Sequence, residues 1–562
     1  MKRNNQKQSG EQSIARWLPY TLIALTCLLL YGQTTGFQFI GFDDQLLIQD
    51  NLKYLKSITN IADAFRHDVF YVPGYKGSEA YYRPVFTVSL MLDAQFGSTS
   101  AIFHRTNILI HILACCTVFL LFTELGHKAS LSLFFSLIMA VHPILAQAIA
   151  WVPGRNDSML GLFALTSFYY FIRFLKTNKR ISLYSHMCFF ALALYTKESA
   201  VFLPVVYCIY YFNEYRSTHT KWFTAKPVIL LIGWGVITLV WILLRHFALS
   251  ETPLHLTPKD IAGYLVPNLP MIVQYIGKLV FPLNLSTWPA VQDTPVIPGY
   301  MIIALVFSLL FFSKTKRIRY VWLGVIWFLI FLLPSLIVPV FIGMEHRVYL
   351  PMIGLFIVVG EIDYVRAFDI RRTGFITIAL VVIIIFATST FSHSQDYKDK
   401  ISFWQNAVET SPHAAIAHVN MGAVYNDQGN LDKAEEEYLL AIKNNEKEPM
   451  VHNNLAIIYM KKKRFDEAEK EFKQEIKINS TYTDAYFNLG IFYIQQFQDQ
   501  DAETYLAKAI QITPDHVSAI KYLAALYAER NEIERQDSLV DLMSQKGVKP
   551  LPPGTIKSLR IK

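Results

Sequence analysis

Long apolar runs, separated by short basic segments, fill the chain up to about residue 392. One of them, residues 376–387, reads ITIALVVIIIFA. Only 17% of the residues are charged and 53% are hydrophobic, whereas a soluble globular protein usually has about 25% charged residues. A membrane-spanning helix needs about 20 largely apolar residues, and about eleven segments approach that length. The sequence therefore predicts a polytopic membrane protein and excludes a disordered chain, a coiled coil or an ordinary soluble enzyme.

The positions of the basic residues predict how the spans are oriented. Clusters such as Lys176–Arg180 and Lys314–Arg319 fall in alternate loops, and cytoplasmic loops are enriched in Lys and Arg. This pattern requires residues 262–283, which two prolines interrupt, to lie at the interface or to re-enter rather than to span. With the N-terminus inside and an odd number of spans, the part of the chain that follows residue 395 lies outside the cytosol.

A period of 34 residues marks the chain from about residue 415 onward. A small residue recurs at one position, Tyr follows it by three residues, and Ala follows it by twelve. This pattern is typical of the tetratricopeptide repeat, in which small residues lie where two helices cross closely. The signature positions are Gly422, Tyr425, Ala434, Ala456, Tyr459, Ala468, Gly490, Tyr493 and Ala502.

The predicted fold is all-α: a polytopic membrane helix bundle followed by a tetratricopeptide α-solenoid. Three full repeats over about 415–516 and a helical remainder stack on one another, because one repeat cannot bury its apolar face alone. A concave surface for a protein or peptide is the favoured role, and a spacer or dimerisation arm is the alternative. The predicted parts are a cytoplasmic tail (1–16), a membrane catalytic region (17–395, with a large first outer loop at 35–102), the repeats (396–548) and a tail (549–562).

Two adjacent carboxylates, Asp43 and Asp44, open the first outer loop directly after the first span. Repulsion between neighbouring acids tends to raise the pKa of one of them toward the range of a general base. The alternative interpretation is a helix N-cap or a solvated loop acid. The loop ends with YYRP, which contains Arg83.

The short outer loops each contain an acid close to a base. Ionisable residues at membrane depth are functional candidates by default. The cations of these loops could together bind an anionic lipid phosphate, and the alternative is three salt bridges within the loops. The pairs are Arg155 with Asp157, Lys197 with Glu198, and Arg347 with Glu345.

The second predicted span carries His104, Asn107 and His111 on one helical face. Hydrogen bonding between helices is favoured over metal binding for this face. The sequence contains no Walker loop, GxSxG elbow or HExxH motif, so ATP hydrolysis and serine hydrolysis have no support.

The ordered set of motifs resembles the C-type glycosyltransferase (GT-C) superfamily, and within it the tetratricopeptide-containing protein O-mannosyltransferases. The order is DD after the first span, YYRPV, HxxNxxxH, HPI…AWVPGRND, KE, EHRVYLP and then the repeats. Two positions depart from the family pattern. Gln147 stands where the family tends to have an acid, and His346 separates Glu345 from Arg347.

The resemblance implies a glycosyltransferase that moves a sugar, mannose by this likeness, from a polyprenyl-phosphate carrier to Ser or Thr hydroxyls of proteins. The repeats would bind the protein acceptor, and membrane lipid would surround the bundle. We expect no nucleic acid, no cofactor and no metal. The membrane would be the bacterial inner membrane, or the endoplasmic reticulum in a eukaryote, with the repeats on the periplasmic or lumenal side. The implied roles are base for Asp43 or Asp44, phosphate binding for Arg83, Arg155, Lys197 and Arg347, and support for His104, Asp157, Glu198 and Glu345.

Two other functions remain open from the residues alone. A non-enzymatic tetratricopeptide membrane scaffold would gather partners and would have no need of the outer-loop acids. A lipid-linked oligosaccharide ligase would typically place its large outer loop late in the chain, whereas the large loop is the first one in this sequence.

Overall fold

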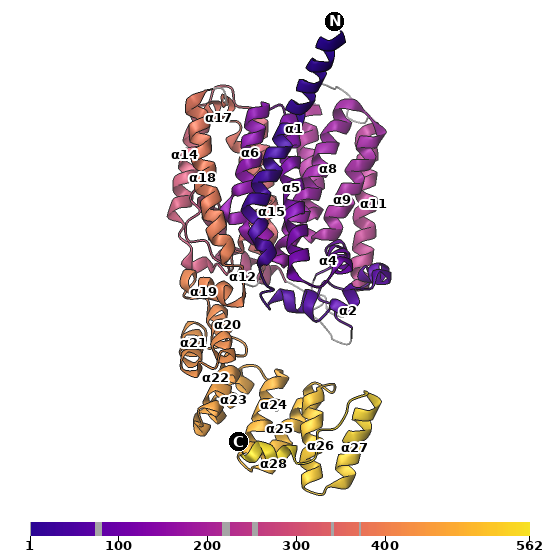
Figure 1. Cartoon of the computed structure of the whole chain (residues 1–562), viewed down its shortest axis with the longest axis vertical. Coiled ribbons are helices and arrows are strands. Elements are labelled where there is room, and N and C mark those ends of the chain that lie inside the picture. Colours follow the sequence, from indigo (N-terminus) through magenta and orange to yellow (C-terminus); the bar gives the residue numbers. More distant parts are fainter. Residues whose placement is uncertain are drawn as a thin grey trace. The chain divides into compact units, whose positions relative to one another are not determined.

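The computed structural model describes residues 2–73, 81–215, 225–249, 257–338, 342–369 and 372–561. It divides into two compact units, Met1–Thr410 (unit 1) and Ser411–Lys562 (unit 2), shown in Figure 1. Helices dominate both units, and the described ranges contain no strand beyond an isolated bridge between Ala290 and Ile342. The predicted all-α fold is therefore confirmed.

Unit 1 is a bundle of apolar helices. Within the described residues, five helices have the length and composition to cross a membrane, and the bent combination of α6 with the segment up to Ala150, at 54°, is a sixth candidate. The longer helices of the bundle are α1 (Lys2–Tyr31), α5 (Ser100–Glu124), α6 (Ala129–Val141), α8 (Arg155–Thr177), α9 (Arg180–Thr196), α11 (Ala225–Ala248), α14 (Ile297–Phe312), α15 (Ile318–Leu336) and α18 (Thr373–Gln395).

Shorter helices account for several of the predicted spans, so the count of about eleven stays a prediction. α10 (Leu203–Tyr210) and α16 (Pro351–Val359) have 8 and 9 residues. Residues 262–283 form two helices, α12 (Pro258–Asn268) and α13 (Pro270–Val280), rather than one. The break falls at Pro270, because proline cannot donate the backbone hydrogen bond that would continue a helix.

The first and last long helices of unit 1 end at the same face of the bundle. The Gln33 side chain, just after α1, donates to the Phe391 carbonyl in α18 at 3.4 Å. The Gln38 N–H donates to the Lys398 carbonyl at 2.8 Å. The first loop and the exit from α18 are thus joined, and the chain leaves unit 1 at the face that holds the first loop.

The first loop is partly helical and runs across this face. Residues 74–80 of the loop lie outside the described ranges. The remaining elements of unit 1 are η1 (Gly32–Gly36), η2 (Gln45–Gln49), α2 (Leu52–Leu55), η3 (Ile58–Asn60), α3 (Ile61–Ala64), α4 (Pro84–Phe96), η4 (Pro143–Leu145), α7 (Ala146–Ala150), η5 (Val152–Gly154), η6 (Glu198–Phe202), η7 (Tyr211–Tyr215), η8 (Val291–Asp293), η9 (Glu345–Val348), α17 (Asp363–Arg366) and α19 (Lys400–Thr410).

Unit 2 is a solenoid of four helix pairs and a short final helix. The helical remainder predicted after the third repeat forms the fourth pair. The first helices of the pairs are α20 (Ala415–Asp427), α22 (Val451–Lys461), α24 (Thr483–Gln495) and α26 (Val517–Glu529). The second helices are α21 (Leu431–Asn444), α23 (Phe465–Ile478), α25 (Asp499–Ile512) and α27 (Ile533–Gln545), and α28 (Thr555–Ile561) follows.

Small signature residues lie where the two helices of a pair touch. A Cβ atom on Gly422 would come within 2.7 Å of the Tyr438 ring, and one on Gly490 within 2.8 Å of Leu506. Ala434 and Ala468, on the facing helices, have no exposed surface. The period of 34 therefore records a steric requirement for close helix crossing, as the sequence predicted.

Candidate functional site

The acidic pair lies near the start of the first loop, after α1 and η1. Gly41 precedes it with a φ of +75°, in the left-handed region that favours glycine. The turn lets Asp44 reach back, so that its Oδ2 accepts a hydrogen bond from the Ile40 N–H at 2.9 Å. Asp44 is 1% exposed and Asp43 is half-buried. Two carboxyls are therefore held close together and largely away from bulk water.

Burial raises the pKa of both carboxyls above the ordinary aspartate value. The pKa of Asp44 rises to about 7, mainly through burial and also through the Asp43 charge, against the Ile40 hydrogen bond and the Trp151 indole. The pKa of Asp43 rises to about 6 through burial, and the Arg83 charge opposes the rise. A carboxyl that titrates in this range is well matched to general base catalysis near neutral pH.

Three cations, Arg83, Lys197 and Arg347, lie close to one another, and we call them the cationic group. Lys197 Nζ contacts the two Asp157 carboxylate oxygens at 2.8 and 2.6 Å. Burial lowers the pKa of Lys197, Asp157 opposes that change, and the Arg83 and Arg347 charges lower the pKa further. Since Arg83 also acts on Asp43, the acids and the cationic group form one electrostatic cluster.

His346 adjoins the cationic group and is held in place by Gln147. The Gln147 Oε1 accepts hydrogen bonds from the His346 backbone N–H at 3.0 Å and from its Nδ1 at 2.9 Å. Gln147 Nε2 in turn donates to the Thr287 carbonyl at 3.0 Å. Burial lowers the pKa of His346 to about 3, so the ring is neutral and keeps its proton on Nδ1. Its Nε2 lies 3.7 Å from Asp157 Oδ2.

Partners in the site come from different loops rather than from neighbouring sequence positions. Lys197 binds Asp157 of α8 and leaves its neighbour Glu198 to another cation. Glu198 accepts from Arg83 Nε at 3.1 Å and from the Tyr82 N–H at 3.1 Å, both at the end of the first loop. These bonds tie the first loop, α8 and the start of η6 to one another.

Glu345 and Arg347 are likewise not paired with each other. Glu345 has no exposed surface and binds Lys278 Nζ at 2.8 Å and His393 Nε2 at 3.2 Å. Arg347 donates to the Ile342 carbonyl at 3.3 Å. The insertion of His346 thus separates a buried, fully engaged acid from a cation that belongs to the cationic group.

Arg155 stands apart from the cationic group and does not pair with Asp157. It has no exposed surface, and its Nη2 lies 2.6 Å from Asp93 Oδ2. Its Nε donates to Asn107 Oδ1 at 2.6 Å, and Nη2 also donates to the Phe103 carbonyl at 2.7 Å. With its guanidinium engaged inside the protein, Arg155 ties α4, α5 and α8 together rather than presenting a free charge.

His104 lies on α5 near Arg155 and is 1% exposed. Neither of its ring nitrogens has a hydrogen-bond partner among the described residues. Its ring contacts Phe37 edge to face, at 6.1 Å between ring centroids. Its neighbour on the same helical face, His111, forms the expected kind of bond between helices, with Nδ1 2.7 Å from the Tyr349 hydroxyl.

Sequence reasoning missed two charged residues that anchor the site. Asp93 is the partner of Arg155, and Lys278 is the partner of Glu345. Each stands alone in an apolar stretch, MLDAQF for Asp93 and IGKLVF for Lys278. Burial of a single charge in such a stretch costs free energy unless the charge is paired. The isolated charges were therefore the feature of the sequence that could have identified these residues.

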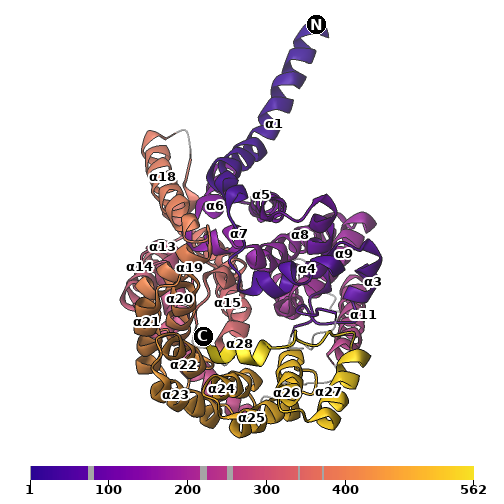
Figure 2. The same ribbon diagram turned by 60° about the horizontal axis from the view of Figure 1, so that its bottom comes forward.

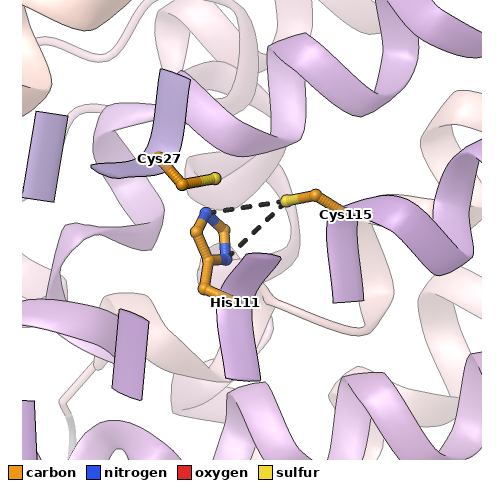
Figure 3. A group of neighbouring side chains, drawn as sticks. All are labelled: Cys27, His111 and Cys115. Carbon is orange, nitrogen blue, oxygen red and sulfur yellow. Dashed lines mark hydrogen bonds between the residues drawn. The ribbon is translucent and has the colours of Figure 1, made fainter. Parts of the chain in front are cut away.

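A second polar cluster, inside the bundle, contains Cys27 of α1 with His111 and Cys115 of α5 (Figure 3). The Cys115 sulfur lies 3.7 Å from His111 Nε2 and 3.9 Å from Nδ1, and Cys and His side chains are common zinc ligands. However, His111 Nδ1 already contacts Tyr349 and Nε2 contacts the Ala140 carbonyl at 3.4 Å. A metal would have to displace one of these bonds, and we assign none to the cluster.

Comparison with known proteins supports both parts of the sequence interpretation. Tetratricopeptide repeat models match residues 402–449, 427–483 and 459–527. A Caenorhabditis elegans protein O-mannosyl-transferase is 23% identical over 441 residues, which cover 75% of this chain and 62% of that relative. The chain is similar to protein O-mannosyl-transferases.

Further relatives carry the same name. A Xenopus laevis protein O-mannosyl-transferase is 28% identical over 253 residues, or 42% of this chain and 29% of that protein. One from Mus musculus is 32% identical over 168 residues, or 26% of this chain and 22% of that protein. The chain thus spans less than two thirds of the length of these relatives. The resemblance drawn from the ordered motifs is confirmed.

Proposed function

We propose that this chain is a membrane mannosyltransferase that moves mannose from a polyprenyl-phosphate carrier to Ser or Thr hydroxyls of proteins outside the cytosol. One observation supports this most strongly: two carboxyls with raised pKa values share an electrostatic cluster with three cations at the face reached by the first loop. Such a transfer needs a carboxylate that accepts a proton and cations that bind the departing phosphate.

Asp43 is the general base in this proposal. It is half-buried, so an acceptor hydroxyl can reach it, whereas Asp44 is 1% exposed and fixed by the Ile40 N–H. Asp43 takes the hydroxyl proton while the hydroxyl oxygen forms a bond to C1 of the sugar. The bond from C1 to the phosphate oxygen breaks, and its electron pair leaves with the lipid phosphate. Attack opposite the phosphate inverts the configuration at C1.

The cationic group stabilises the departing phosphate. Lys and Arg form charge-assisted hydrogen bonds to phosphate oxygens, and Arg does so with two parallel donors. Asp157 binds Lys197 and Glu198 binds Arg83, so two carboxylates face the three cations and neutralise only part of their charge. Arg155 has a structural role in this proposal, and its many bonds position α8, which carries Asp157.

We assign the tail of the lipid carrier to an apolar groove that extends along the bundle to Lys316, at the end opposite the first loop. It has a volume of about 580 Å³ and is lined by α13, α14, α15 and α16, with side chains such as Phe307, Trp322 and Phe328. The tail of the carrier already lies in the apolar bilayer, so the groove holds it through van der Waals packing rather than by removing it from water. The repeats of unit 2 bind the protein acceptor, and no metal takes part in the proposed reaction.

A transfer assay with variants of the acidic pair tests the proposal. Asp43→Asn removes the base, and we expect transfer from polyprenyl-phosphate-mannose to a Ser- or Thr-containing peptide to fall by about 10²–10⁴-fold. Asp50→Asn, an exposed acid in the same loop, is the matched control and should retain activity. GDP-mannose should not replace the lipid donor. Full activity of Asp43→Asn would remove this residue from the mechanism.

The pH dependence gives a second test of the same base. Since the pKa of Asp43 is about 6, the base becomes deprotonated as the pH rises through that value. We therefore expect kcat/KM of the wild-type protein to rise between about pH 5 and 7 and the residual rate of Asp43→Asn to lack this rise. A profile that is identical in both proteins would contradict the assignment.

A further inference from the structure

Trp288 carries a buried N–H group whose partner is missing from the part of the chain that the structure describes. Trp288 is 7% exposed, and its Nε1 has no hydrogen-bond partner among the described residues. A buried donor without a partner costs free energy, so such an atom usually meets water or a ligand. The reaction steps proposed above make no use of this residue, and its N–H therefore needs an explanation of its own.

Hydrogen bonds fix the backbone that carries Trp288. Its backbone N–H donates to Ser286 Oγ at 3.2 Å. The preceding residue, Thr287, donates through its N–H to Asn406 Oδ1 at 2.8 Å and through its hydroxyl to the Phe403 carbonyl at 2.7 Å. Asn406 and Phe403 belong to α19, which packs against the segment that follows α13 (Figure 2). The protein itself thus positions the indole.

Two further aromatic rings pack around the indole, and we call Phe42, Trp288 and Trp404 the aromatic cluster. The Phe42 ring meets the Trp288 ring edge to face, at 5.3 Å between centroids, and the Trp404 ring lies 5.8 Å from that of Trp288. Phe42 also contacts Trp404, at 5.7 Å. Phe42 directly precedes Asp43, the proposed base. The aromatic cluster is therefore next to the acidic pair.

Trp288 is also connected to the side of the site that holds the cationic group. The carbonyl of its neighbour Thr287 accepts from Gln147 Nε2 at 3.0 Å, and Gln147 Oε1 accepts from His346, the residue before Arg347. In the proposed reaction the sugar lies between the base and the cations, because the acceptor oxygen attacks C1 on the side opposite the phosphate. A residue that is joined to both sides therefore borders the place of the sugar.

The chemistry of the aromatic cluster suits a sugar better than the other parts of the substrates. A sugar hydroxyl has an oxygen that accepts a hydrogen bond from an N–H, and the C–H groups of a sugar ring pack against aromatic side chains. A phosphate would need a cation, and the three residues of the cluster are uncharged. An isoprenoid tail has no acceptor for the N–H, and the acceptor hydroxyl goes to the base.

We propose that the Trp288 N–H donates a hydrogen bond to one hydroxyl oxygen of the donor sugar, and that Phe42 and Trp404 hold the indole in place for this contact. Trp288 is then a specificity-determining residue, because a buried donor stays unpaired when the sugar lacks the matching hydroxyl. The inference rests on the function proposed above and deepens it, since it names a residue that recognises the sugar itself.

Binding of two radiolabelled lipids to the full-length protein in detergent micelles tests the inference without requiring transfer. The lipids are polyprenyl-phosphate-mannose and polyprenyl phosphate without a sugar. Trp288→Phe removes the N–H and keeps an aromatic ring, so it should weaken binding of the mannosylated lipid by about 5–10-fold and change binding of the sugar-free lipid by less than about 2-fold. Trp327→Phe is the matched control and should leave the ratio of the two affinities unchanged, because Trp327 is buried and its N–H donates to the Leu350 carbonyl at 2.8 Å.

Donor lipids that each lack one sugar hydroxyl identify the contact. One of them should bind the wild type about 5–10-fold more weakly than polyprenyl-phosphate-mannose does, and should bind Trp288→Phe as well as that lipid does, because the bond is absent in both cases. Equal weakening of both lipids by Trp288→Phe would make the indole a support of the fold, and unchanged binding of both would leave it in contact with water only. Either result would overturn the inference. Absence of transfer with binding that depends on the sugar would count against the proposed enzyme and not against Trp288.

Discussion

The two units bury ionisable side chains in different ways. In unit 2, His418 Nδ1 binds Glu437 at 2.7 Å and His452 Nδ1 binds Glu471 at 2.5 Å, and each pair joins residues 19 apart within one helix pair. In unit 1, Lys197 and Asp157 are 40 residues apart, and Lys278 and Glu345 are 67 apart. A local pair is copied when a repeat is copied. A long-range pair exists only when the whole bundle has assembled.

Buried pairs of the first kind stabilise a single structural element, whereas pairs of the second kind hold together a site built from several elements. The two histidine–glutamate pairs of unit 2 brace single repeats, so each of them contributes locally. The pairs of unit 1 join loops and helices that approach the acidic pair from different parts of the chain. Disruption of one of them should therefore affect the whole site.

Arg155→Ala should destabilise unit 1 more than any other change considered. It leaves Asp93 buried without its cation, and the loss of one partner of a buried pair typically costs about 3–5 kcal/mol. Lys176→Ala, on the same helix, is the control: its contact with Glu124 at 2.9 Å is half exposed, and such pairs contribute about 0–1 kcal/mol. Denaturant unfolding in micelles measures the free energy of unfolding of both variants. Similar losses of stability in the two would show that the contacts of Arg155 do not anchor α8.

A double-mutant cycle on Lys197 and Asp157 should show that partners across loops are energetically coupled. We expect a coupling free energy of about 1–3 kcal/mol for this pair, against less than about 0.5 kcal/mol for the sequence neighbours Lys197 and Glu198. The reason is the direct contact of Lys197 Nζ with Asp157 at 2.6 Å. Unfolding free energies of the single and double variants provide the measurement. Stronger coupling of Lys197 to Glu198 than to Asp157 would contradict this prediction and favour pairing within the loop.

The His452 pair should make the stability of unit 2 depend on pH. The pKa of His452 is raised because its hydrogen bond to Glu471 favours the protonated ring, in spite of burial. The stabilisation is complete below the ordinary histidine pKa and is lost as the pH rises through the raised value. We expect the free energy of unfolding of unit 2 to fall by about 1 kcal/mol once the pH exceeds the raised pKa of His452. His452→Gln should flatten this dependence in thermal unfolding, whereas Lys473→Ala, an exposed pair with Glu469, should leave it unchanged.

The same contrast explains what could be predicted from the sequence. Gly422 and Gly490 were predictable because a period of 34 reports a steric demand that recurs in every repeat. Asp43 and Asp44 were predictable as a close pair of carboxyls, because adjacency alone brings two charges together. The partners of Lys197 and Glu345 were not predictable, because adjacency in the sequence favoured Glu198 and Arg347. Only the packed bundle shows that Lys197 contacts Asp157 and that Glu345 contacts Lys278.

The bond between Gln147 and His346 has a consequence for the side of the site that holds the cationic group. An amide at position 147 adds no negative charge, and the imidazole beside it stays neutral because its pKa is about 3. In the proposed reaction, neither Gln147 nor His346 therefore changes the charge of the wall that meets the leaving group across the physiological range. In that reaction, a change in the pH of the compartment would act on this protein through the acidic pair, whose carboxyls have pKa values of about 6 and 7, rather than through His346.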